Sequence, residues 1–198
     1  KFIRYFPLGA YFAQNFIFEN PGFYETFNSY IHECQADNIA LSNPEKLILK
    51  KLALETKATI VEYAQGLVTR QNERHKNVTN AELLELDKIW RNKKSLEGKE
   101  LRRTVLNNTL SIYLKEIKQK SLNLYSEIIV TDNKGLNVGQ SDVTTDYWQG
   151  DEDKFKKTYS IGADAIFIDD IKFDQSSKTF QSQLNLTIAD TSGVAIGI

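Results

Sequence analysis

The sequence predicts an α+β fold in which helices come first and an antiparallel sheet follows. Apolar residues recur at helical spacing between residues 42 and 120, and at every second position after Ser121. The charges divide near the same point: residues 1–124 carry 19 basic and 14 acidic side chains, whereas residues 125–198 carry 6 and 12. Because helices favour Glu and Lys while β-turns favour Asp, this division agrees with the change of period.

Two start signals place helices in the first part of the chain. The segment 42–45 supplies a serine that can cap a helix and then a proline in the first turn, and an apolar stripe continues to about residue 72. The segment 79–82 has the Thr-x-x-Glu form of a capping box. Gly98 then marks a break or a kink, after which the spacing predicts one long amphipathic helix from Leu101 to about Lys120.

The first 41 residues give weaker signals. Residues 1–18 are rich in aromatic side chains, and the apolar spacing from Phe23 to Ala40 is helical. His32 and Cys34 are two positions apart in this segment, so on a helix they point away from each other. We therefore do not expect them to form a catalytic pair.

Alternation with a period of two predicts the strands of the second part. A hairpin is expected from strands at 127–131 and 136–141, because Asp132–Gly135 has the composition of a tight turn. A short helix is expected at 151–159, with acidic residues at its positive end. The remaining strands are expected at 165–174, 179–189 and 193–198. Within 179–189 the apolar Phe180, Leu184, Leu186 and Ile188 alternate with the polar Gln181, Gln183, Asn185 and Thr187.

Composition and motifs exclude several classes of protein. A formal net charge of -1 argues against a strongly basic nucleic-acid binder. No apolar run reaches the roughly 18 residues of a membrane span, so no transmembrane segment is expected. The sequence contains no P-loop, nucleophile elbow, His-Glu-x-x-His or Gly-x-Gly-x-x-Gly motif, and its single cysteine and two histidines suggest no metal site. We therefore expect no catalytic residue, no metal ligand and no cofactor, and interpret the protein as a non-enzyme.

An unusual cluster lies between residues 142 and 152. Two adjacent large aromatic residues, Tyr147 and Trp148, are flanked by Asp146, Gln149 and Asp151. Aromatic walls with a few placed polar groups are typical of small-molecule pockets. The residues themselves leave two interpretations open: the loop lines such a pocket, or its two aromatic side chains close the end of the sheet.

The run from Gly135 to Glu152, GLNVGQSDVTTDYWQGDE, closely resembles the signature of extracytoplasmic PAS-like sensor modules, the Cache or PDC sensor family. The preceding segment 125–132 resembles the first strand of that family, and 86–91 resembles part of its leading helix. Two later segments, 180–184 and 193–197, resemble its last two strands.

The resemblance covers about residues 80–198 and implies a fold. In this family a long N-terminal helix packs behind a PAS-like five-stranded antiparallel sheet, and a ligand pocket lies on the other face. We therefore divide the chain into an additional helical N-terminal segment at 1–78 and a sensor domain, led by a long helix, at 79–198.

The resemblance also implies a function. Such modules are not enzymes; they bind small organic molecules such as amines, amino acids or carboxylates in the periplasm, as secreted domains or as parts of membrane receptors. Residues 104–198 contain no arginine that could clamp a carboxylate, which favours a cationic or neutral ligand with Asp146 or Asp151 as its counter-charge. The ligand-binding residues that we predict are Tyr125, Asp146, Tyr147, Trp148, Gln149, Asp151 and Tyr159.

A second hypothesis comes from a different class of function. The protein would be a structural or interaction protein, in which the helical half forms a homodimer and the sensor fold is vestigial. A pocket that binds small molecules distinguishes the first hypothesis, and a concentration-independent monomer in light scattering contradicts the second.

Overall fold

The computed structural model describes residues 38–121, 124–174 and 179–198. Most of the predicted helix at 23–40, with His32 and Cys34, lies outside these residues, and at its described end Asn38–Ile39 form a strand, β1. The helices are α4 (Asn43–Arg74), α5 (Asn80–Arg91), α6 (Leu96–Leu106), α7 (Thr109–Lys120) and α8 (Asp153–Tyr159). The other strands are β2 (Ile129–Thr131), β3 (Asn137–Gln140), β4 (Ile166–Ile168), β5 (Ile171–Asp174), β6 (Thr179–Gln181), β7 (Leu184–Leu186), β8 (Ile188–Ala189) and β9 (Ala195–Gly197).

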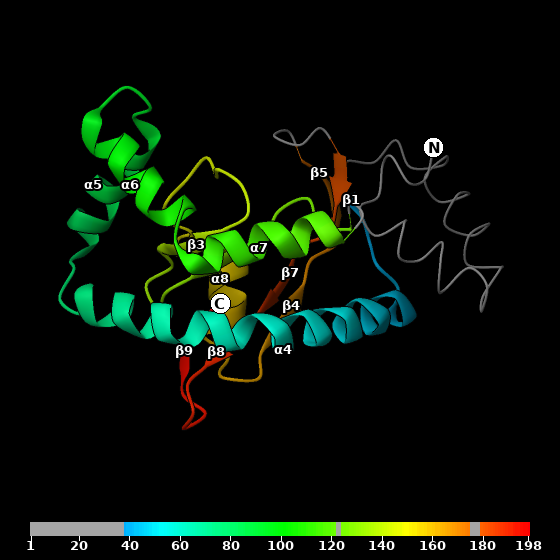
Figure 1. Ribbon diagram of the computed structural model, residues 1–198. Coiled ribbons are helices and arrows are strands. Elements are labelled where there is room, and N and C mark those ends of the chain that lie inside the picture. The colour runs from blue at the N-terminus through cyan, green and yellow to red at the C-terminus, as the bar shows by residue number, and fades with distance from the viewer. Residues whose placement is uncertain (1–37, 122–123, 175–178) are drawn as a thin grey trace.

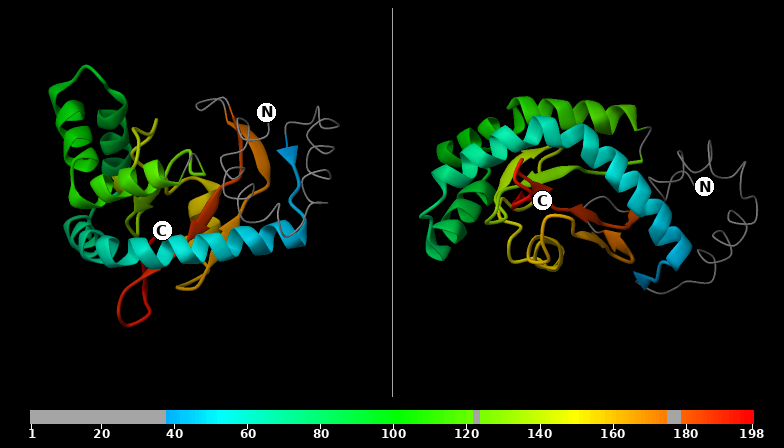
Figure 2. Two further views of the ribbon diagram at one scale, coloured as in Figure 1. Left: turned by 45° about the vertical axis from the view of Figure 1, so that its right-hand side comes forward. Right: turned by 90° about the horizontal axis from the view of Figure 1, so that it is seen from below.

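The longest element is α4, and it begins where the sequence predicts. The backbone N–H and the hydroxyl of Ser42 both donate to the carboxylate of Glu45, at 2.7 and 2.6 Å, so Glu45 closes the first turn onto Ser42. Figure 1 shows α4 running along one side of the molecule, and Figure 2 shows α4 and α7 on one side of the strands with α8 on the other. The strands are therefore covered by α4 and α7 on one face and by α8 on the other.

The single long helix expected from Leu101 to Lys120 is wrong, because the chain forms two helices there. The side chain of Asn108 accepts the backbone N–H of Ser111 at 2.8 Å and donates to the carbonyl of Val138 at 2.7 Å. It therefore caps a new helix, α7, and ties its start to β3. Gly98 lies in the first turn of α6 and not at a break. The position requires glycine because a Cβ atom there would collide with the carbonyl oxygens of Ile89 and Asn92.

The predicted hairpin is confirmed: β2 and β3 pair antiparallel, and Gly135 in the turn has a φ of 84°. The two long strands expected at 165–174 and 179–189 are each divided into shorter pieces. In the first, β4 pairs with β7 and β5 pairs with β6, with β1 on the outer edge of β5. The chain is a mixed α+β protein with short antiparallel strand pairs.

The last strand joins two of these pairs. β9 pairs with β8, where Ile188 lies opposite Gly197. It also reaches β2, since the backbone N–H of Thr131 donates to the carbonyl oxygen of Ile198 at 2.7 Å and Asp132 forms an antiparallel bridge with Gly197. At this level β9 therefore lies between β2 and β8.

The main core lies between α4, α7 and the strands. On α4 it contains Ile60, Ala64 and Val68, which follow one another at helical spacing. From the other elements it contains Leu110, Leu114, Val130, Val138, Ile188 and Ile196. The helix α4 thus shares a core with strands of the predicted sensor domain, while the division of the chain at residues 78 and 79 stays a prediction.

Candidate functional site

The loop at 142–152, which the sequence singles out, is packed against α5. The Tyr147 side chain is only 3 % exposed and stacks on Trp90 with 5.3 Å between the ring centroids. Both rings belong to a second core with Leu83, Val105 and Leu136. Burial raises the pKa of the Tyr147 phenol above its ordinary value, and the nearby Asp132 carboxylate adds to this rise.

A buried carboxylate on α5 holds the backbone of this loop. One oxygen of Asp87 accepts the backbone N–H groups of Tyr147, at 2.8 Å, and of Trp148, at 3.1 Å. The other oxygen of Asp87 accepts a hydrogen bond from the Nε–H of Arg91 at 2.7 Å. The Nη2 atom of Arg91 lies 2.8 Å from the carboxylate of Asp146. An arginine does lie beside this loop, although it comes from α5 and is engaged by two carboxylates.

The other polar residues of the loop have partners as well. Trp148 donates its indole N–H to the carbonyl of Lys134 at 2.8 Å. The backbone N–H of Gln149 donates to Gly135 at 2.7 Å, and its side-chain amide donates to the carbonyl of Asp146 at 3.1 Å. Asp151 is exposed, and its carbonyl accepts the Lys156 ammonium.

The two remaining predicted residues lie apart from the loop. The Tyr125 hydroxyl lies 2.5 Å from the Thr56 hydroxyl of α4. Tyr159, on α8, stacks on Phe155 at 5.2 Å and donates its hydroxyl to the carbonyl of Ala195 at 3.2 Å. Burial raises the pKa of Tyr159. The structure therefore does not bring the seven predicted residues together at one surface.

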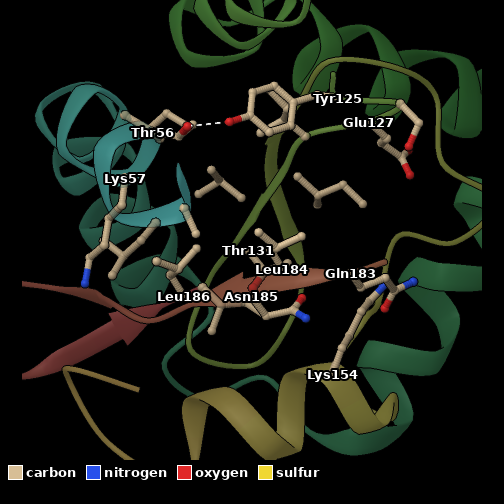
Figure 3. A pocket seen from close by; sticks show the side chains of 18 of the residues that line it. Thr56, Lys57, Tyr125, Glu127, Thr131, Lys154, Gln183, Leu184, Asn185 and Leu186 are labelled. Carbon is tan, nitrogen blue, oxygen red and sulfur yellow. Dashed lines mark hydrogen bonds between the residues drawn. The ribbon is translucent and has the colours of Figure 1, made fainter. Parts of the chain in front are cut away.

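A cavity of about 230 Å³ lies between α4, the segment 124–131, the segment 181–188 and α8. Of the seven predicted residues, Tyr125 and Gln149 line it, whereas Asp146, Tyr147, Trp148, Asp151 and Tyr159 do not. Figure 3 shows Thr56, Lys57 and Tyr125 at one end, and Lys154 rising from α8 toward Gln183 at the other.

The two sides of the cavity differ in polarity because side chains alternate along each strand. Val130 packs in the core beside α4, and Leu184 packs against the core cluster that contains Leu49 and Leu52 of that helix, so these side chains form an apolar α4 side. The next side chains along the chain point the opposite way. Thr187, for example, points toward α8, since its hydroxyl donates to the carbonyl of Thr158 in that helix.

We call the opposite face of the cavity the α8 side, and it is mostly polar. It is lined by Glu127, Thr131, Gln149, Lys154, Gln183 and Asn185. The ammonium of Lys154 lies 3.0 Å from the carboxylate of Glu152, at the start of α8. Gln183 and Glu127 are exposed, so this side opens to solvent at its edge.

Two polar groups on the α8 side are buried without a partner among the described residues. They are the hydroxyl of Thr131, a residue that is 2 % exposed, and the side-chain Nδ2 of Asn185. A buried donor or acceptor that makes no hydrogen bond costs about 1–3 kcal/mol, so native proteins rarely keep one without a reason. Both residues belong to the walls of the cavity, where a bound molecule would reach them.

Sequence reasoning missed Thr131, Lys154 and Asn185 as site residues. The available signal was the alternating polar series Gln181, Gln183, Asn185 and Thr187, in which amides and a hydroxyl stand where a strand exposed to solvent more often carries charges. Hydroxyl and amide side chains are well suited to orienting a ligand in a closed site.

Three further observations bear on the site. Comparisons with protein-family models, with curated proteins and with solved structures find no match to this chain. Within the part of the chain that the structure describes, His, Cys, Asp and Glu residues do not gather in groups of three that could hold a metal ion. No helix in that part has both the length and the apolar composition to cross a membrane.

Proposed function

We propose that this protein is a non-catalytic sensor module of the Cache or PDC type, which binds a small organic molecule on the α8 side of the cavity. The observation that carries the proposal is the pair of buried polar groups, on Thr131 and Asn185, that line the cavity without a partner in the described chain. A ligand that supplies an acceptor to Asn185 and a hydrogen-bond partner to Thr131 removes both penalties.

The charges around the cavity suggest the class of ligand. The α8 side contains an ammonium group on Lys154 and a carboxylate on Glu127. A zwitterionic amino acid presents a carboxylate and an ammonium group of its own, so it matches both signs, whereas a simple amine or carboxylate matches one. The cavity is smaller than the roughly 300–1,000 Å³ of pockets for drug-sized ligands, which favours a small amino acid.

The arrangement of strands supports a PAS-like sheet. The described pairings give a spatial order of β3, β2, β9 and β8, and β7, which precedes β8, pairs with β4. The polar side of the cavity is opposite the longest helix, as the family resemblance implies. In this proposal the long helix of the module is α4, and α5 to α7 lie between that helix and the hairpin. The module works in the periplasm or elsewhere outside the cytoplasm.

A matched series of probes tests the ligand class. L-alanine, propionate and n-propylamine share a three-carbon skeleton but carry a zwitterion, an anion and a cation, respectively. We expect L-alanine at 10 mM to raise the melting temperature measurably, propionate to raise it less, and n-propylamine to leave it unchanged. Equal, unsaturable effects of all three probes, or none from any, would contradict the proposal.

Two variants and one control locate the binding. Asn185→Leu removes the unpaired amide, and Lys154→Gln removes the ammonium group; we expect either variant to lose the shift produced by L-alanine. The control is Lys157→Gln on the same helix, where the lysine pairs with Asp153 at 3.0 Å. This control should keep the shift, and a loss in the control as large as in Lys154→Gln would rule out binding on the α8 side.

One observation favours the second candidate, a dimer formed through the helices. Leu47 and Leu54 are seven residues apart on α4 and are exposed, Leu47 by 68 %. Residues spaced by seven lie on one face of a helix, so the pair presents two exposed apolar side chains on the same face of α4. In this alternative, light scattering gives twice the monomer mass and Leu47→Glu returns it to the monomer value. A monomer at all concentrations contradicts it.

A further inference from the structure

Three buried polar atoms on the β2–β3 hairpin lack a hydrogen-bond partner among the described residues. They are the hydroxyl of Thr131, which the proposed ligand contacts, the side-chain Oδ1 of Asn137 and the side-chain Nε2 of Gln140. Asn137 and Gln140 are both fully buried. A buried donor or acceptor without a partner destabilises the folded state, so two such amides on one strand indicate that a molecule other than the described chain supplies their partners.

A bulge in β3 places both amides on the same face of the hairpin. The pairing of β2 with β3 shifts by one residue at this point. Val138 packs in the core beside α4, and a Cβ atom at Gly139 would meet a leucine of α7, so these two consecutive residues face the same helices. Asn137 and Gln140, on either side of the bulge, therefore face the opposite way, which is the α8 side.

Asn137 lies next to the wall of the cavity. It is directly opposite Thr131, which lines the cavity. The backbone N–H of Thr131 donates to Ile198 and that of Asn137 donates to Tyr147, so the two residues exchange no backbone hydrogen bond. In an antiparallel ladder the side chains of such a pair are the closest to each other.

The hydroxyl of Thr144 connects the two amides. It accepts a hydrogen bond from Nδ2 of Asn137 at 3.0 Å and lies 3.5 Å from Oε1 of Gln140. Gln140 is opposite Ile129, which also lines the cavity. We call Thr131, Asn137 and Gln140 the polar corner, and it adjoins the cavity along β2.

The chemistry of the polar corner is specific because it offers both kinds of hydrogen bond and no charge. Oδ1 of Asn137 requires a donor, and Nε2 of Gln140 requires an acceptor. A hydroxyl group serves both atoms. A carboxylate cannot donate to Asn137, an ammonium group cannot accept from Gln140, and a methyl group does neither.

We propose that the polar corner is the subsite for the side chain of the bound amino acid, and that it selects a side chain with a hydroxyl group. This selection rests on the proposed function, because it requires an amino acid whose charged groups are held on the α8 side of the cavity. Without a hydroxyl the ligand leaves Asn137 and Gln140 as they are in the free protein, and it gains nothing from them.

Two amino acids of equal size test this selection. L-serine and L-2-aminobutyrate each extend L-alanine by one heavy atom, the first by a hydroxyl and the second by a methyl group. We expect L-serine to bind at least about tenfold more tightly than L-2-aminobutyrate in isothermal titration calorimetry, because a buried site with unpaired polar groups discriminates against an analogue without the matching hydroxyl. In amide NMR, L-serine should shift the side-chain resonances of Asn137 and Gln140, and L-2-aminobutyrate should leave them in place.

One variant and its control place the hydroxyl at the corner. Gln140→Met removes the unpaired donor and keeps the length of the side chain. We expect the preference for L-serine to fall below about threefold, with the affinity for L-alanine unchanged. Gln119→Met is the matched control, since Gln119 is exposed on α7, and it should keep the full preference. If Gln140→Met does not fold, the NMR shifts in the original protein decide the question.

Two results would overturn the selection and leave the proposed function intact. The first is equal affinity for L-serine and L-2-aminobutyrate while L-alanine binds, which would mean that the polar corner does not contact the ligand. The second is an undiminished preference for L-serine in Gln140→Met, which would place the hydroxyl elsewhere. If none of the three amino acids binds, the proposed function itself is wrong, and the selection with it.

Discussion

The loop at 142–152 and the α8 side of the cavity share Gln149, and they differ in how most of their polar groups are satisfied. In the loop, the backbone N–H groups of Tyr147 and Trp148 and the indole of Trp148 have hydrogen-bond partners. The carboxylate of Asp146 is buried at Oδ1 without a hydrogen bond, but it forms an ion pair with Arg91 at 2.8 Å. On the α8 side, the hydroxyl of Thr131 and the amide of Asn185 have no hydrogen-bond partner among the described residues.

This difference suggests that the loop contributes mainly to the stability of the fold, whereas the α8 side is the better candidate for binding a ligand. A group that already makes its hydrogen bonds gains little from a ligand, whereas a buried group without a partner gains one. The loop therefore holds the hairpin to α5, and the cavity is the place where, in our proposal, a ligand binds. Substitutions in the two regions should affect the free energy of unfolding very differently.

We expect the largest effect on the free energy of unfolding from a substitution that removes a packing partner of the loop. Trp90→Ala removes a ring that is 1 % exposed and stacks on Tyr147, and it should lower the free energy of unfolding by about 3–5 kcal/mol. Urea denaturation followed by circular dichroism measures this. Leu96→Ala is the control, since Leu96 is exposed, and its effect should stay within about 0.5 kcal/mol.

The next effect comes from the carboxylate that holds the loop. Asp87→Ala leaves two backbone N–H groups without their acceptor and removes one of the two carboxylates that engage Arg91, and should cost about 3 kcal/mol in the same assay. Glu85→Ala, on the exposed face of the same helix, tests whether any lost carboxylate has this effect. A similar loss in both variants would mean that Asp87 does not specifically anchor the loop.

The pH dependence of the free energy of unfolding tests the burial of Tyr147 in the loop. Because burial raises the pKa of Tyr147 above about 10, its unfolded value, the folded protein holds this proton more tightly. The resulting stability is complete below about pH 10 and decreases as the pH rises above it, by at most about 1.4 kcal/mol per pH unit for this group. Tyr147→Phe should make the decrease between pH 10 and 11 shallower. An unchanged slope would contradict the assignment.

The smallest expected effect on stability is on the α8 side. Thr131→Val replaces an unpartnered buried hydroxyl by a methyl group, and the free energy of unfolding should stay within about 1 kcal/mol of the original value or increase. The same variant should weaken the melting shift produced by L-alanine. A loss of more than about 2 kcal/mol would show that the hydroxyl already has a partner and carries no binding role.

Local signals in the sequence predicted the local structure well. The cap at Ser42, the capping box at Thr79 and the glycine turn at Gly135 are each found where the sequence places them, since these interactions involve residues at most three positions apart. The break at Asn108 was missed because its cause is distant: its amide donates to Val138, thirty positions further on.

At the candidate site, too, the sequence did not predict interactions between residues that are far apart in the chain. Tyr147 and Trp148 attracted attention as aromatic residues in a loop, but Trp90 and Asp87, which hold them, lie about sixty positions earlier. The side chains of Tyr147 and Trp148 pack in a core with residues of α5 and α6 and do not line the cavity. Asn185 gave only a weak signal, because its lack of a partner depends on which elements fold over its face.

The most direct test of the account is a titration with L-alanine followed by amide NMR. We predict saturable shifts of the side-chain amide resonances of Asn185 and of the backbone amide of Thr131, while the backbone amides of Tyr147 and Trp148, held by Asp87, stay in place. Saturable shifts at Tyr147 and Trp148 with Asn185 unmoved would contradict the account, because they would place binding in the loop and not on the α8 side of the cavity.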